Sequence, residues 1–234
     1  MTPTLLLFDI DGTLITTGGA GYRTMKRAVE VTLEVESALD GIPVAGRTDN
    51  IILRDALRAL GDRELSDELR DRIRDVYCEL LQKELDRISG GPGVLPGVRE
   101  LLRRLSGDRA YHLALLTGNF SQSARIKLGY YDLWRYFEWG AFGEDAVDRN
   151  DLLPVALSRY RERTGRPIAA SHVVIIGDTP NDVEVARTGG TRIVCVTTGQ
   201  FARAALLEAG ADVVFHDLSD VDAVLDVLGK TGVT

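Results

Sequence analysis

The distribution of apolar residues along the chain predicts an alternation of buried strands and helices. Short runs rich in Leu, Ile and Val, typical of buried parallel strands, occur at residues 5–8, 113–116, 173–176, 193–196 and 213–215. Helical periodicity follows or separates most of them, at residues 96–105, 121–128, 152–163, 180–188, 202–209 and 221–228. This order indicates an α/β fold with a doubly wound, Rossmann-like parallel sheet as its core. A weaker strand is expected near residues 136–139.

One interval in this alternation is too long for a single crossover. Residues 14–113 separate the first two expected strands, so this connection must contain an insert. Glycine-rich stretches open the insert at residues 18–21 and close it at residues 90–93. Between them, apolar residues from Leu69 to Leu85 recur at steps of three and four, as in an amphipathic helix.

We therefore predict two domains. Residues 1–18 and 91–234 form the Rossmann-like catalytic core, and residues 19–90 form an inserted all-helical cap on paired glycine hinges. A cap of this kind suits chemistry that excludes water and then releases a product. The alternative is a helical subdomain that packs rigidly on the core.

Composition and charge narrow the range of partners. The chain has 234 residues, 44% of them hydrophobic, and a formal net charge of −7. This charge argues against nucleic acid or an anionic membrane as the main partner, and no apolar run approaches the roughly 18 residues of a membrane span. Cys78 and Cys195 have neither disulfide-framework nor zinc spacing and are expected to be buried thiols. We expect a cytoplasmic monomer or homodimer.

Acidic residues follow two of the expected strands. Asp9 and Asp11 come directly after the first strand, and Asp178 and Asp182 come after the strand at residues 173–176. Like charges at the mouth of a strand repel one another unless a cation, a shared proton or hydrogen-bond donors hold them. Because carboxyl ends of parallel strands meet at one edge of a sheet, these four side chains could surround one hard cation.

A polar segment with the features of a phosphate site follows the second expected strand. Thr117 offers a hydroxyl, and the backbone amides of Gly118 and Asn119 precede a helix whose positive end favours anions. Gly12 has no side chain to prevent its amide from approaching the same anion. Together these residues indicate an anionic, phosphorylated ligand.

Three segments resemble the first, second and fourth motifs of the haloacid dehalogenase-like hydrolase superfamily: residues 9–13 (Asp-Ile-Asp-Gly-Thr), 116–119 (Leu-Thr-Gly-Asn) and 177–182 (Gly-Asp-Thr-Pro-Asn-Asp). Their order and spacing, with a helical insert after the first motif, are similar to the phosphoglycolate phosphatase-like members. The resemblance implies a Mg²⁺-dependent phosphatase that acts on a small phosphorylated metabolite, with phosphoglycolate as the default substrate. It leaves two alternatives: a sugar phosphomutase, or a catalytically silent binding or regulatory module.

The resemblance also assigns roles to the acids. It implies that Asp9 is the nucleophile, which forms an aspartyl-phosphate, and that Asp11 is the general acid and base. Asp9, the backbone carbonyl of Asp11, and Asp178 would bind Mg²⁺, with Asp182 at the ion or its water shell. The alternative for Asp182 is to cap the helix that begins at Pro180.

The third motif departs from the family pattern, which usually supplies a lysine beside the nucleophile. No lysine lies between Lys127 and Lys230. Lys127 is expected to be carried away from the site by the helix that follows the second strand. Arg149 resembles the usual position, and a guanidinium can bridge carboxylate and phosphate, so we favour Arg149, with a solvated surface charge as the alternative.

One loop of the expected cap is a candidate for substrate selection. Arg47 and Thr48 precede a helix that starts near Asn50, and related phosphatases place a similar loop over the leaving group. Arg47 could meet a carboxylate or second anionic group of the substrate. The alternative is that Thr48 or Asp49 only caps the helix.

Overall fold

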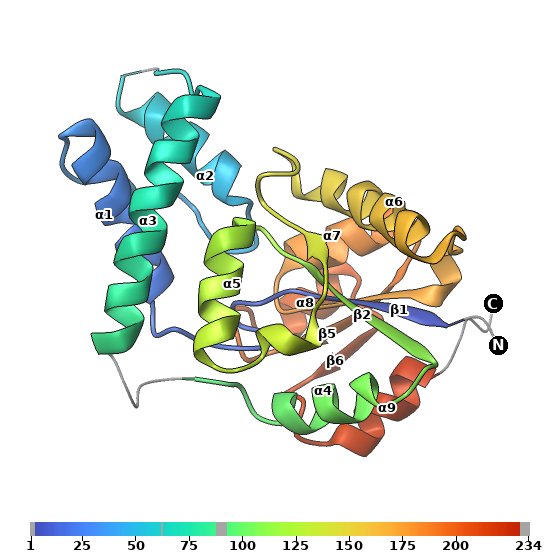
Figure 1. Ribbon diagram of the computed structural model, residues 1–234. Coiled ribbons are helices and arrows are strands. Elements are labelled where there is room, and N and C mark those ends of the chain that lie inside the picture. The colour runs from blue at the N-terminus through green and yellow to red at the C-terminus, as the bar shows by residue number, and fades with distance from the viewer. Residues whose placement is uncertain (1–2, 62, 88–92, 230–234) are drawn as a thin grey trace.

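The computed structural model describes residues 3–61, 63–87 and 93–229 (Figure 1). Within these residues six parallel strands form one sheet in the order β3-β2-β1-β4-β5-β6. The order reverses at β1, which is the doubly wound arrangement that the sequence predicts. The strands are β1 (Thr4–Phe8), β2 (Tyr111–Leu116), β3 (Gly140–Ala141), β4 (Val173–Gly177), β5 (Arg192–Val196) and β6 (Val213–Phe215).

Strand β1 lies at the centre of the sheet, where Leu6 pairs with Leu113 of β2 and Val174 of β4. Its apolar side chains alternate between two cores, as strand geometry requires: Leu6 and Phe8 pack into one cluster and Leu5 and Leu7 into the other. The five strong apolar runs are thus confirmed as strands.

Helices cover both faces of the sheet (Figure 1). One face packs against α4 (Val98–Ser106), α5 (Ser121–Tyr130) and α9 (Val221–Gly229). The other face packs against α6 (Leu152–Thr164), α7 (Pro180–Gly189) and α8 (Arg203–Ala209). No helix among the described residues is long and apolar enough to cross a membrane.

The strand expected near residues 136–139 is present but lies slightly further along the chain. Residues Trp134–Tyr136 form a 3₁₀ turn, and the short strand β3 follows at Gly140–Ala141. The aromatic side chains of Trp134 and Tyr136 pack against the core from this turn. A Cβ at Gly140 would lie 2.7 Å from the Leu115 Cβ. The position of this strand therefore depends on the close approach of Gly140 to strand β2, which a pattern of apolar residues cannot predict.

Among the described residues between β1 and α4 there are three helices: α1 (Ala20–Leu33), α2 (Asp49–Ala59) and α3 (Asp67–Arg87). Figure 1 shows them beyond the carboxyl end of β1, away from the chain termini. They share a buried cluster of their own, joined by Phe120 from the start of α5. Of the second glycine stretch, residues 90–92 lie outside the described part of the chain, so the paired hinges and the two-domain division stay predictions.

Candidate active site

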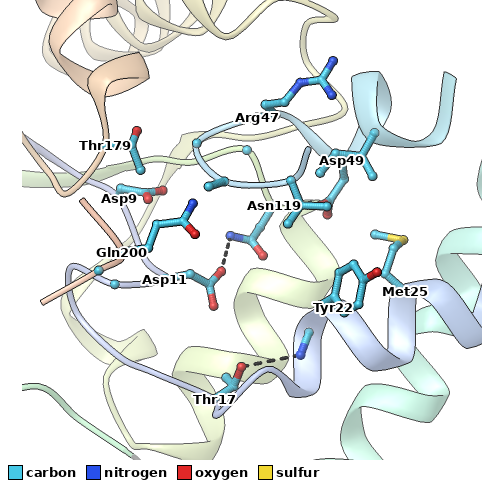
Figure 2. Close-up of a pocket in the computed structure, with 18 of the residues that line it drawn as sticks. Asp9, Asp11, Thr17, Tyr22, Met25, Arg47, Asp49, Asn119, Thr179 and Gln200 are labelled. Carbon is cyan, nitrogen blue, oxygen red and sulfur yellow. Dashed lines mark hydrogen bonds between the residues drawn. The ribbon is translucent and has the colours of Figure 1, made fainter. Parts of the chain in front are cut away.

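A cavity of about 510 Å³ lies between the carboxyl ends of the strands and helices α1–α3 (Figure 2). The connections after five strands reach it, as expected for an open parallel sheet. They contribute Asp9, Asp11 and Gly12 after β1, Gly118 and Asn119 after β2, Arg149 after β3, Asp178 and Thr179 after β4, and Thr198, Gly199 and Gln200 after β5.

Three of the four predicted acids form one buried cluster. Asp9, Asp178 and Asp182 each offer a carboxylate oxygen, and these oxygens lie within 4.8 Å of one another. Burial, together with the neighbouring carboxylates, raises the pKa of Asp9 to about 6 and holds the pKa of Asp178 well above its usual value. A hard divalent cation prefers oxygen ligands and would offset this repulsion. The cluster therefore fits Mg²⁺, although Asp11 directs its side chain elsewhere.

Glycine residues make room for the Asp178 carboxylate. Its Oδ1 accepts a hydrogen bond from Thr13 Oγ1 at 3.0 Å. Gly12 has a φ of +81°, and a Cβ there would lie 2.4 Å from Asp178 Oδ2; a Cβ at Gly199 would lie 1.8 Å from the same atom. Gly12 is thus required by a left-handed turn and by the neighbouring acid. Its predicted contact with a phosphate stays a prediction.

Arg149 lies in the acid cluster. Its Nη2 is 3.2 Å from Asp9 Oδ1 and 2.5 Å from Asp182 Oδ1, and its side chain is 7% exposed. The alternative of a solvated surface charge is wrong. Asp182 also closes a capping box with Thr179 at the start of α7, which confirms the predicted cap. Because both oxygens of Asp182 already have donors, Asp9 and Asp178 are the acids better suited to hold a metal ion directly.

The expectation that Lys127 points away from the site is wrong. Lys127 is buried, and its Nζ donates to Asp11 Oδ2 and to Asn119 Oδ1, both at 2.6 Å. Asn119 Nδ2 donates to the same Asp11 oxygen at 2.9 Å. Helical side chains lean toward the helix N-terminus, so Lys127 reaches back along α5 to the loop that precedes it. The site therefore contains both cations that the sequence offered as alternatives.

Thr117 organises the loop after β2. Its hydroxyl is fully buried and accepts hydrogen bonds from Asn119 N at 3.3 Å and Asn119 Nδ2 at 2.8 Å. The adjacent Gly118 and Asn119 line the cavity, whereas Thr117 is not among the lining residues. A role for Thr117 in phosphate binding stays a prediction.

The loop before α2 lines the cavity with residues 44–47. Thr48 Oγ1 accepts from Ile51 N at 3.2 Å and donates to Val147 O at 2.7 Å, so Thr48 is the helix N-cap, as the alternative reading held. The Arg47 guanidinium pairs with Asp55 at 2.5 Å. Figure 2 shows it directed away from Asp9. Their predicted contacts with substrate stay untested.

Asp49 is a residue that sequence reasoning treated only as a possible cap. It lines the cavity with 8% exposure, and its Oδ2 accepts from Phe120 N at 2.8 Å. Burial raises its pKa to about 7, an effect that Lys127 partly offsets and that Asp11 and Glu144 increase. The burial of Asp49 could not be predicted from neighbouring residues in the sequence, because the start of α5, which is distant in sequence, covers its side chain.

This pKa makes the stability contribution of Asp49 pH-dependent. Between about pH 4 and pH 7 the folded protein holds a proton that the unfolded chain has lost, so stability falls as pH rises through this window. Asp49→Asn cannot ionise, and it keeps an oxygen for Phe120 N. From about pH 4 to pH 7 we expect the unfolding free energy of the variant to rise relative to that of the native protein by about 3 kcal/mol, measured by urea denaturation. A difference in unfolding free energy between the variant and the native protein that does not change with pH would contradict a raised pKa of Asp49.

Comparison with known proteins identifies relatives along most of the chain. Residues 3–190 match the family model described as haloacid dehalogenase-like hydrolase. The chain is 30% identical to a phosphoglycolate phosphatase of Caulobacter vibrioides over 92% of this chain and 88% of that protein. Among solved structures it resembles CbbY from Rhodobacter sphaeroides in complex with phosphate (TM-score 0.71, 17% identity, 96% and 100% coverage). It also resembles a candidate β-phosphoglucomutase from Thermotoga maritima (TM-score 0.62, 23% identity, 96% and 99% coverage).

Proposed function

We propose that this chain, which belongs to the haloacid dehalogenase-like hydrolase family, is a Mg²⁺-dependent phosphatase. It hydrolyses a small phosphate monoester through an aspartyl-phosphate on Asp9. The observation that carries the proposal is the buried contact between Asp9 and Arg149, next to Asp178. This contact places Asp9, the nucleophile, beside Arg149, a cation that can bind the phosphoryl oxygens. Asp178 lies next to them as a second acid for a metal ion.

In the first step an oxygen of Asp9 attacks phosphorus, the new oxygen–phosphorus bond forms, and the bond from phosphorus to the leaving oxygen breaks. The backbone of Asp9 is fixed by its N–H bond to Ile176 O at 2.9 Å, and Arg149 offers donors to the phosphoryl oxygens. Mg²⁺, held by Asp9 and Asp178, would reduce the repulsion between the carboxylate and the anionic substrate.

Asp11 transfers the protons of both steps. In protonated form it gives a proton to the leaving alkoxide; once ionised, it takes a proton from the water that attacks the phosphorylated Asp9. Inorganic phosphate and free Asp9 result. Asp11 lines the cavity with a side chain that is 41% exposed, so it can face either the leaving group or water.

Lys127 is expected to position Asp11. Lys127→Met removes the 2.6 Å contact with Asp11 Oδ2 and leaves Asn119 as the remaining donor to that oxygen. We expect kcat to fall by about tenfold to a hundredfold, measured by phosphate release at saturating substrate. Lys83→Met is the matched control, because Lys83 is 68% exposed and pairs with Glu79 on the surface of α3. Equal rates for the two variants would contradict a positioning role.

We further propose that residues 19–90 act as a cap over the cavity. Helices α1–α3 have their own buried cluster, and the cavity lies between these helices and the loops of the sheet. Such an arrangement allows substrate to enter and product to leave when the two parts separate.

The experiment that tests the proposed function is phosphate release from a panel of small phosphate esters, with and without Mg²⁺. The names of curated relatives make phosphoglycolate the first ester to include. Release that requires Mg²⁺ supports a phosphatase. Failure to release phosphate from any ester, while Mg²⁺ still binds, would contradict it and favour a phosphomutase or a silent binding module.

A further inference from the structure

The side of the cavity across from the acids is apolar. Figure 2 shows Tyr22 and Met25 of α1 on the far side of Asp11 and Asn119 from Asp9. The same wall contains side chains from the connection between α1 and α2 and from α2 itself. Its members are Tyr22, Met25, Leu39, Val44 and Ile52. If the phosphate lies at Asp9, as the proposed function requires, the leaving group must extend toward this wall.

The cations that line the cavity are already bound by other groups. Arg149 pairs with Asp9 and Asp182 at the phosphate end. Lys127 pairs with Asp11 and also interacts electrostatically with Asp49, so two acids already share its charge. Arg47 pairs with Asp55 and also donates to Pro43 O at 2.9 Å. Among the described lining residues no other Lys or Arg is present. A carboxylate on the leaving group would therefore find no cation among the described lining residues that is not already paired with an acid.

Two polar side chains near this wall have oxygen atoms that are accessible from the cavity. Asp49 Oδ2 accepts from Phe120 N, but its Oδ1 makes no hydrogen bond within the described chain. The Tyr77 hydroxyl also makes none there, although Tyr77 is 2% exposed and lines the cavity. A carboxylate oxygen accepts a hydrogen bond from a hydroxyl and repels another carboxylate.

The cavity is also large for a glycolate ester. Its volume of about 510 Å³ falls in the range of roughly 300–1,000 Å³ that is typical of sites enclosing larger organic ligands. A glycolyl group at the acids would leave the apolar wall uncovered.

We infer that the substrate is a phosphate monoester whose leaving group carries an apolar flank and a hydroxyl for Asp49, and no carboxylate. The inference rests on the proposed function and narrows it. It differs from the substrate that the names of the phosphoglycolate phosphatase relatives indicate.

The test compares kcat/KM for three esters in the presence of Mg²⁺: 2-phosphoglycolate, 2-hydroxyethyl phosphate and 2-hydroxyhexyl phosphate. 2-Hydroxyethyl phosphate has a hydroxymethyl group in place of the carboxylate of 2-phosphoglycolate. 2-Hydroxyhexyl phosphate keeps the hydroxyl and adds an apolar alkyl chain. We expect kcat/KM to rise by about tenfold or more at each replacement, the scale of discrimination that pocket contacts of this kind provide.

Asp49→Asn tests the charge directly when the esters are compared at about pH 8.5, because Asp49, with a pKa of about 7, is ionised there. It is expected to narrow the preference for 2-hydroxyethyl phosphate over 2-phosphoglycolate by about tenfold. Asp75→Asn, at a side chain that is 63% exposed on α3, removes the same charge outside the cavity and should leave the preference unchanged. Calorimetric binding of the esters to Asp9→Asn gives the same comparison without turnover, and does not depend on the folding of the Asp49 variant.

Phosphoglycolate used or bound at least as well as the hydroxyalkyl esters would overturn the inference and leave the phosphatase intact. An unchanged preference in Asp49→Asn would overturn the role of Asp49. If none of the three esters nor p-nitrophenyl phosphate releases phosphate, the proposed function itself fails, and the inference with it.

Discussion

Asp9→Asn is expected to abolish phosphate release, with a fall in kcat of at least about a thousandfold. The amide has nearly the same size as the carboxylate but is a poor nucleophile, so the attack on phosphorus is lost. The measurement is phosphate release with Mg²⁺ at saturating ester, for the native protein and the variant side by side.

Folding provides the control for this result. Asp9 is buried beside Asp178 and Asp182, and burial with these neighbours raises its pKa to about 6. Removing its charge relieves repulsion, so without Mg²⁺ the melting temperature of Asp9→Asn should equal or exceed the native value. A variant that is folded and keeps more than about a tenth of native kcat would show that Asp9 is not the nucleophile.

Arg149→Met should reduce both activity and stability. The side chain of Arg149 is the cation in contact with Asp9 and Asp182, which are almost fully buried. Without it, these carboxylates lack a positive partner, and breaking a buried pair in this way costs about 3–5 kcal/mol. Urea unfolding should show this loss near pH 7.5. It should be smaller near pH 5, because carboxylates of raised pKa take up protons there.

Arg149→Lys is the informative control for this variant. It keeps the positive charge but loses the planar fork that can bridge carboxylate and phosphate. We expect it to recover most of the stability and only part of kcat. If Arg149→Met loses less than about 1 kcal/mol near pH 7.5, the buried pair does not hold the acids together.

Local sequence patterns were sufficient for the main strands and for most of the helices around them. Runs such as residues 173–176 are apolar on both faces, which is typical of a strand covered by helices on either side. Strand β3 was misplaced because it has two residues and is set by the close approach of Gly140 to Leu115. Such an approach depends on the neighbouring strand, and no local pattern encodes it.

Some residues of the candidate site could likewise be predicted from local sequence patterns, and others could not. Asp9, Asp178 and Asp182 could be placed together because they follow strands that end at one edge of the sheet. Lys127 and Asp49 could not, because each is buried by segments distant in sequence: Lys127 by the loop after β1, and Asp49 by the start of α5. A lysine in a helix and an acid after a threonine have ordinary local explanations, and only the tertiary structure shows that both line the cavity.

The most direct test of the central claim is detection of the phosphoryl group on Asp9. Native protein with Mg²⁺ and the best ester of the panel would be quenched in acid during turnover, digested, and examined by mass spectrometry. We expect one phosphoryl group on the peptide that contains Asp9, and none in Asp9→Asn. Steady turnover with no phosphorylated peptide, or with the phosphoryl group on another residue, would contradict the mechanism.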